Sequence, residues 1–219
     1  MSVRDADLYE ALLHRLGTRK SDLPLSVVEW GAGRSTLWYP RFLETLGVKY
    51  RWLALEHDRV FFEREVGQEL RRRTNATVIH SEDLELDEAR RMLRSGGVAA
   101  VVFDKGELLP FRADRECDRG VSLEDYVELP ARLGFKCDLA VIDGRKRRRC
   151  MLEAVRILGE GGYVILHDAW REYYQCAWSA FRSGRRFGDE WWIGSLSVTD
   201  FCDVLPWHAF ERHEEPPTG

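Results

Sequence analysis

Residues 27–36 read Val-Val-Glu-Trp-Gly-Ala-Gly-Arg-Ser-Thr, and this stretch decides the fold. The apolar run at 25–30 predicts a short buried strand, Gly31 and Gly33 predict a tight turn, and 35–46 favours a helix. Glycine lets the backbone turn sharply and leaves room for a ligand beside it. The first N–H groups of the following helix lack partners within that helix. The stretch therefore predicts a β-turn-α unit with a ligand at the turn.

The same alternation of strand and helix continues on both sides of this unit. Apolar runs predict further strands, and helical spacing of apolar residues predicts helices. The expected strands are 50–56, 76–80, 137–143 and 163–167, and the expected helices are 8–16, a charged stretch ending at 73, and 148–158. Alternating strands and helices indicate an α/β, Rossmann-like doubly wound sheet that is mostly parallel. The alternation at 193–198 adds an antiparallel C-terminal edge.

The length of 219 residues is typical of a single domain spanning 1–219. The segment 82–136 is less regular than the rest and combines an apolar run at 98–103 with a polar stretch. Long irregular segments in compact domains are usually functional or disordered. We therefore expect 82–136 to be an insertion, or a lid over the acceptor side of the site.

Composition excludes several classes of protein. A net charge of −4 argues against a general polyanion-binding protein, so bulk nucleic acid is not the expected partner. No apolar run approaches the roughly 20 residues that span a bilayer, and the first residues lack a signal-peptide pattern. The five cysteines show no CxxC spacing, which indicates reduced thiols. We expect a cytoplasmic protein without a membrane partner.

Two carboxylates flank the predicted ligand. Glu29 immediately precedes the glycine turn, and Glu56 ends the next predicted strand. A carboxylate at the second strand end suits the hydroxyls of a ribose. One beside the turn suits a cationic ligand better than a pyrophosphate. Thr36 stands where the dinucleotide-binding fingerprint has its third glycine, so the pattern favours S-adenosylmethionine over NAD.

These motifs resemble class I methyltransferases, whose first motif is acidic-x-Gly-x-Gly and whose second is an acid closing the second strand. Residues 29–33 and Glu56 match both motifs. The run Glu-Trp-Gly-x-Gly-x-Ser-Thr-Leu-Trp is similar to small bacterial sugar or natural-product O-methyltransferases. The resemblance covers 25–174 and is weakest across 82–136.

This resemblance implies roles for further residues. It places Ser35 and Thr36 near the methionine moiety of S-adenosylmethionine and Asp83 near the adenine. Asp83 can alternatively cap the acidic stretch that follows it. Gly31 would lie against the cofactor, so we expect a Gly31→Val substitution to block binding with little loss of fold.

Acids also follow two later strands. Asp143 and the pair His167-Asp168 come at predicted strand ends, and parallel strands gather such residues in one cleft. The surrounding pattern resembles O-methyltransferases whose corresponding acids, here Asp143 and Asp168, bind a divalent cation such as Mg²⁺ or act as a base. A neutral hydroxyl is a poor nucleophile, and either device would activate it. Ala169 stands where a third metal ligand is expected, so both metal-assisted catalysis and direct base catalysis remain alternatives. His167 is a further catalytic candidate.

The acceptor side is predicted from basic and aromatic residues. Arg145, Arg171 and Tyr173 follow the same two strand ends and are candidates for substrate binding. Arg145 begins the run 145–149, which could recognise a carboxylate, a phosphate or RNA. The Leu-His-Asp strand end is also similar to plant glucuronoxylan methyltransferases, which favours a carbohydrate hydroxyl among small-molecule acceptors.

The sequence therefore predicts transfer of a methyl group from S-adenosylmethionine to a hydroxyl of a sugar or another small molecule. The alternatives are an NAD-dependent oxidoreductase, an RNA methyltransferase and a non-catalytic S-adenosylmethionine-binding module. The sequence leaves open the acceptor, its methylated position, the need for a metal and the oligomeric state.

Overall fold

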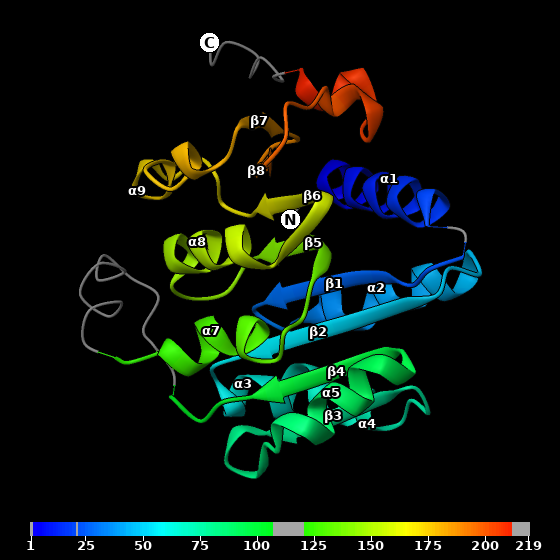
Figure 1. Ribbon diagram of the computed structural model, residues 1–219, viewed down its shortest axis with the longest axis vertical. Coiled ribbons are helices and arrows are strands. Elements are labelled where there is room, and N and C mark those ends of the chain that lie inside the picture. The colour runs from blue at the N-terminus through cyan, green and yellow to red at the C-terminus, as the bar shows by residue number, and fades with distance from the viewer. Residues whose placement is uncertain (1, 21, 107–120, 212–219) are drawn as a thin grey trace, which may run out of the picture.

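A single eight-stranded sheet organises the chain in the computed structural model, which describes residues 2–20, 22–106 and 121–211 (Figure 1). The strand order is β3-β4-β2-β1-β5-β6-β8-β7. The strands are β1 Leu25–Trp30, β2 Tyr50–Glu56, β3 Ala76–His80, β4 Gly97–Val102, β5 Cys137–Ile142, β6 Leu158–Leu166, β7 Ser183–Phe187 and β8 Trp191–Ser195. The first six pair in parallel, and β8 pairs antiparallel with both β6 and β7.

Helices cover both faces of the sheet (Figure 1). One face carries α1 Val3–Arg19, α2 Arg34–Thr45, α3 Arg59–Phe62 and α4 Gln68–Arg71, with a π-helical turn at Glu63–Gly67 between the last two. The other face carries α5 Leu86–Ser95, α7 Glu124–Arg132, α8 Arg147–Ile157 and α9 Glu172–Gln175. Short 3₁₀ turns lie at Ser81–Asp83, Trp178–Ala180, Phe201–Asp203 and Trp207–Phe210.

The core follows from the alternation of side chains along each strand. In β1, Val27 packs into the core on the α1–α2 face and Val28 into the core on the α7–α8 face, and both are fully buried. A parallel strand covered on both faces is apolar along its whole length. The predicted fold class, a mostly parallel α/β sheet with an antiparallel C-terminal edge, is confirmed.

The segment 82–136 differs from its prediction in the parts that the structure describes. Its apolar run forms β4, which lies inside the sheet between β2 and β3. The helices α5 and α7 pack on the same sheet, so these parts belong to the fold rather than to an insertion. Residues 107–120 lie outside the described chain, and a lid there stays a prediction.

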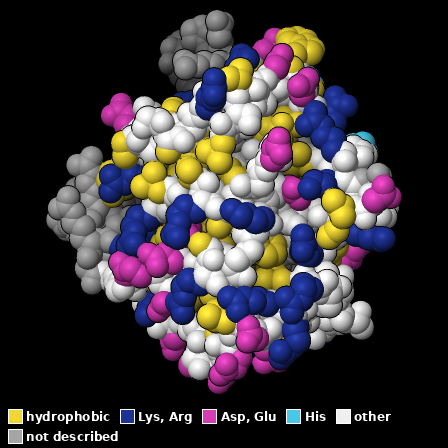
Figure 2. Space-filling view, in the orientation of Figure 1, with side chains coloured by type: hydrophobic (Ala, Val, Ile, Leu, Met, Phe, Trp, Pro, Cys, Tyr) yellow, Lys and Arg dark blue, Asp and Glu magenta, His cyan; other side chains and the backbone are white. Residues whose placement is uncertain are grey.

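The surface carries both signs of charge. Figure 2 shows Lys and Arg side chains distributed over one face together with Asp and Glu. Among the described residues, no helix has the length and apolar character needed to cross a membrane.

Candidate active site

A cleft of about 600 Å³ opens at the carboxyl ends of β1, β2 and β5. α2 follows β1 and α8 follows β5, and these two helices lie on opposite faces of the sheet. The loops that leave the two neighbouring strands therefore diverge at this point. Open α/β sheets bind ligands at such a switch point. Of the predicted site residues, the cleft is lined by Glu29, Gly31, Gly33, Ser35, Glu56, Asp143, Arg145 and Arg171.

Two glycine turns meet at the floor of this cleft. Gly31 has φ +101°, and a Cβ built on it would lie 2.5 Å from the backbone nitrogen of Gly144. The Gly31 N–H donates to the Leu55 carbonyl at 2.8 Å, which ties the turn to β2. The expected effect of Gly31→Val is therefore corrected, because the added side chain would collide with the protein's own backbone rather than only with a cofactor.

Glu29 is completely buried beneath the turn. Its carboxylate accepts hydrogen bonds from Thr36 at 2.7 Å, from the indole N–H of Trp52 at 2.8 Å, and from the Ser35 hydroxyl. Burial raises the pKa of Glu29 to about 7, although the three hydrogen bonds oppose the shift. Glu29 thus fixes the start of α2 through Ser35 and Thr36, and a cation nearby would favour its ionised form.

Glu56 is held so that one of its oxygens stays available. Its Oε1 accepts the backbone N–H groups of His57 and Asp58, both at 2.9 Å. No described residue donates a hydrogen bond to Oε2, and the side chain lines the cleft. A carboxylate fixed in this way is oriented to receive a hydroxyl of a ligand.

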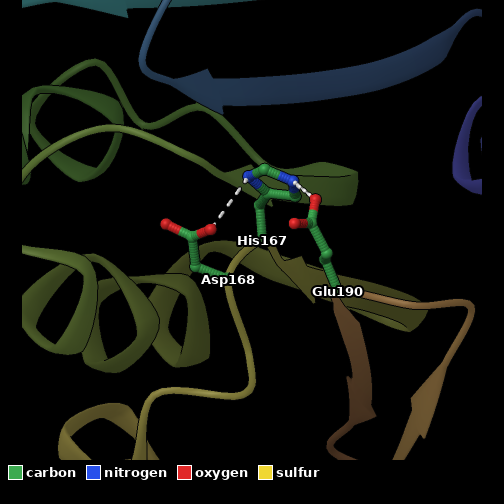
Figure 3. A group of neighbouring side chains, drawn as sticks. All are labelled: His167, Asp168 and Glu190. Atoms are coloured by element: carbon green, nitrogen blue, oxygen red, sulfur yellow. Dashed lines mark hydrogen bonds and ion pairs between the residues drawn. The ribbon is translucent and has the colours of Figure 1, made fainter. Parts of the chain in front are cut away.

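Asp143 begins a chain of three polar side chains. His167 Nδ1 lies 2.8 Å from Asp143 Oδ1, and His167 Nε2 lies 2.8 Å from Glu190 Oε2. Figure 3 shows the imidazole directed at Glu190 on one side, with Asp168 beside its other nitrogen. Of these residues, Asp143 lines the cleft, and the described contacts of its carboxylate all involve Oδ1. Its Oδ2 is therefore the oxygen open to a substrate.

Charges set the ionisation of this chain. Burial alone would raise the pKa of Asp143, but hydrogen bonding to His167 and the charges of Arg147 and His167 lower it. Burial alone would lower the pKa of His167, but hydrogen bonding and charge from Asp143, the charge of Asp168 and the bond to Glu190 raise it. The network favours a carboxylate in the cleft and an imidazolium behind it.

Arg147 holds the two predicted metal ligands together. Its guanidinium donates to Asp143 Oδ1 at 3.1 Å and to Asp168 Oδ2 at 3.0 Å, and Arg171 reaches the same Asp168 oxygen at 3.1 Å. The backbone carbonyls of Asp143, Gly144 and His167 accept its other bonds. A cation already bridges the acids, so this donor set does not fit a divalent ion held by Asp143 and Asp168.

A second acidic group gives no better fit. His167, Asp168 and Glu190 each place a ligand atom within 4.8 Å of the others. A histidine binds a metal through a neutral imidazole nitrogen, whereas both nitrogens of His167 already face carboxylates and its pKa is raised. The described residues therefore favour a protonated histidine over a metal ligand.

Backbone strain also concentrates at these strand ends. Among the described residues other than glycine, positive φ occurs at Lys146, with φ 53°, and at Asp168, with φ 56°. Such conformations cost about 1–3 kcal/mol each and are often found at functional sites. Lys146 is 7% exposed and lines the cleft beside Asp143.

Five predicted residues do not line the cleft. Thr36 is buried under Glu29, and His167 and Asp168 lie behind Asp143. Tyr173 receives a hydrogen bond from Arg148 at 2.5 Å, and the neighbouring Tyr174 lines the cleft instead.

Asp83 is the fifth of these residues, and its expected position beside the cofactor is corrected by the sheet order. Asp83 is exposed after β3, and β4 separates β3 from β2. The chain beside the end of β2 is instead 103–105, where the Phe103 N–H donates to the Glu56 carbonyl at 2.7 Å.

Sequence reasoning missed three contributors. Arg147 was hidden in a run of five basic residues, of which helical geometry directs few into one cleft. Glu190 comes from the turn between β7 and β8, far from the other acids in sequence. Tyr9 of α1 lines the cleft, and its buried hydroxyl has no partner among the described residues.

Because the pKa of His167 is raised, its protonated form stabilises the fold. That contribution is fully present below the pKa of histidine in an unfolded chain, about 6.5, and is lost as pH rises through the folded value. Glu190→Gln weakens this stabilisation, so urea unfolding should show a larger stability difference from wild type near pH 6 than near pH 9. Equal differences at both pH values would contradict a stabilising interaction between Glu190 and the imidazolium.

No family model and no curated protein matches this sequence. A methyltransferase-like protein from Silicibacter pomeroyi is a similar solved structure, with TM-score 0.49, 14% identity and coverage of 94% of this chain and 97% of that one. Spermidine synthase from Thermotoga maritima gives TM-score 0.49 and 15% identity over 91% of this chain and 62% of its own. A glycopeptide N-methyltransferase complexed with S-adenosyl-L-methionine gives TM-score 0.34 and 19% identity, with coverage of 74% of this chain and 55% of its own.

These likenesses concern the arrangement of strands and helices, and they carry no argument about chemistry. The sheet order and pairing by themselves define a Rossmann-like α/β fold with a mostly parallel sheet and an antiparallel C-terminal edge.

Proposed function

We propose that this protein transfers a methyl group from S-adenosylmethionine to a hydroxyl of a sugar or another small molecule. One observation carries the proposal. Glu56 and Asp143 face one cleft, and each has one oxygen fixed by the protein and one without a partner among the described residues. The first suits a ribose and the second an acceptor hydroxyl.

Open space and acidic charge in one half of the cleft support S-adenosylmethionine as its ligand. Gly33 offers open space, because a Cβ built there would meet only the Ser35 hydroxyl at 4.0 Å. Glu29, Glu56 and Asp58 give this wall acidic character, which suits a ligand with ammonium and sulfonium groups. The unpartnered hydroxyl of Tyr9 adds a donor that a ligand can satisfy.

The acceptor half supplies a base and its support. Bound S-adenosylmethionine supplies a methyl group on a positively charged sulfur, which a nucleophilic oxygen displaces. Asp143 Oδ2 accepts the proton that the hydroxyl loses as its oxygen bonds to the methyl carbon. His167 and Arg147 hold the other Asp143 oxygen and keep the carboxylate ionised and oriented.

Glu56→Ala is expected to weaken binding of S-adenosylhomocysteine by about 1–3 kcal/mol, because it removes a charged acceptor for the ribose hydroxyls. Isothermal titration calorimetry measures the loss. Asp83→Ala is the matched control, since this exposed acid lies beyond β4 and outside the cleft.

Titration with NAD on the same preparation separates this function from an oxidoreductase. Binding of NAD in preference to S-adenosylhomocysteine would contradict the proposal, as would unchanged affinity in Glu56→Ala. Methyl transfer to a sugar or phenol in a screen would exclude a non-catalytic binding module.

A further inference from the structure

The start of α8 is an element of the cleft that the proposed function leaves without a role. Residues 144–147 line the cleft and lead directly into this helix of 11 residues. No side chain caps the helix, and the N–H groups of 147–149 find no acceptor among the described residues. A helix N-terminus with free N–H groups and a partial positive charge attracts anions.

Lys146 provides a second, independent indication of an anion. It is the N-cap residue of α8, it is more than nine-tenths buried, and it lines the cleft. Its ammonium group has no hydrogen-bond or ion-pair partner among the described residues. With most of its side chain buried, Lys146 can reach solvent only in the cleft, where an anionic ligand would pair with its ammonium.

The acids at the ends of β5 and β6 and in the β7–β8 turn are paired with cations other than Lys146. Arg147 is neutralised by Asp143 and Asp168, and the His167 imidazolium lies between Asp143 and Glu190. These acids are therefore already engaged with other cations. An anion bound at the start of α8 would give Lys146 a partner that these acids do not provide.

We propose that Lys146 and the N-terminus of α8 bind an anionic group, a carboxylate or a phosphate, on the acceptor that is methylated. The assignment of this anionic group to a methyl acceptor rests on the proposed function. Lys146 and Asp143 come from the same strand-end loop, so the anionic group would be held beside the hydroxyl that Asp143 deprotonates. The acidic residues at the ends of β1 and β2 would thereby favour the cationic cofactor, and the cation at the start of α8 would favour the anionic acceptor.

The test titrates inorganic phosphate, and separately acetate, into the full chain saturated with S-adenosylhomocysteine at constant ionic strength. We expect one of the two anions to bind, and its identity separates a phosphate from a carboxylate acceptor. Lys146→Asn should weaken this binding roughly 10-fold, because it removes a charge-assisted hydrogen bond. Asparagine tolerates the left-handed backbone of this position, so the variant should fold.

Two variants control for the charge. Lys146→Arg keeps the cation at the helix terminus and should keep the binding. Lys49→Met removes an exposed lysine away from the cleft and should leave the binding unchanged. Absence of binding by either anion in the wild-type protein, or unchanged binding in Lys146→Asn, would overturn the inference.

The assignment to the acceptor has its own test. If Lys146 instead held the carboxylate of the cofactor, S-adenosylhomocysteine would compete with the anion, and Lys146→Asn would bind S-adenosylhomocysteine more weakly. Either result overturns the acceptor assignment. Failure of the wild-type protein to bind S-adenosylhomocysteine, with anion binding still dependent on Lys146, would contradict the proposed function and leave the anion site standing.

Discussion

Gly31→Ala is expected to destabilise the protein by about 3 kcal/mol or more, since it combines a strained backbone with an overpacked contact. The residue has φ +101°, and the added Cβ would lie 2.5 Å from Gly144 N and 2.8 Å from the carbonyl carbon of Asp143. These are backbone atoms just after β5, which pairs with β1, so they cannot rotate away as a side chain would. Urea unfolding measures the loss.

Gly47→Ala is the matched control for the backbone conformation. Gly47 has φ +68°, but a Cβ there would meet nothing within 4 Å. Its substitution should cost only about 1–2 kcal/mol for the left-handed conformation. Equal losses in Gly31→Ala and Gly47→Ala would show that the contact between the two glycine turns has little importance.

The strands of the sheet could be predicted where the chain shows a clear apolar run between turn signals. The predicted ranges 25–30, 50–56 and 76–80 coincide with β1, β2 and β3. The apolar run of β4 lies in the segment 82–136, which the sequence predicts to be an irregular insertion. A strand that is buried on both faces shows no alternation, and its position between β2 and β3 depends on long-range pairing that local sequence does not encode.

The convergence of Asp143, His167 and Asp168 could be predicted, because parallel strands bring their carboxyl ends to one edge. The sequence could not predict which cation accompanies them. Arg147 is one of several adjacent basic residues. The left-handed turn at Lys146 directs the guanidinium of Arg147 toward both acids. Glu190 reaches His167 only because β8 returns antiparallel beside β6.

Asp143→Asn is expected to lower the rate of methyl transfer by roughly 10²–10⁴-fold, the usual contribution of a general base. The rate is measured with an acceptor identified in a screen of sugars and phenols, and affinity for S-adenosylhomocysteine should change little. Asp125→Asn is the control, since Asp125 is exposed on α7 and outside the cleft. An unchanged rate in Asp143→Asn would exclude Asp143 as the base.

Chelation distinguishes this base from a metal at the same acids. Arg147 bridges Asp143 and Asp168, so its guanidinium supplies the positive charge that a metal ion would otherwise supply between these acids. We therefore expect a chelator to leave turnover unchanged. Loss of turnover on chelation and its recovery with Mg²⁺ would mean that an ion displaces Arg147 from the acids. Arg147→Met would then strengthen the dependence on Mg²⁺, because it removes the competing charge.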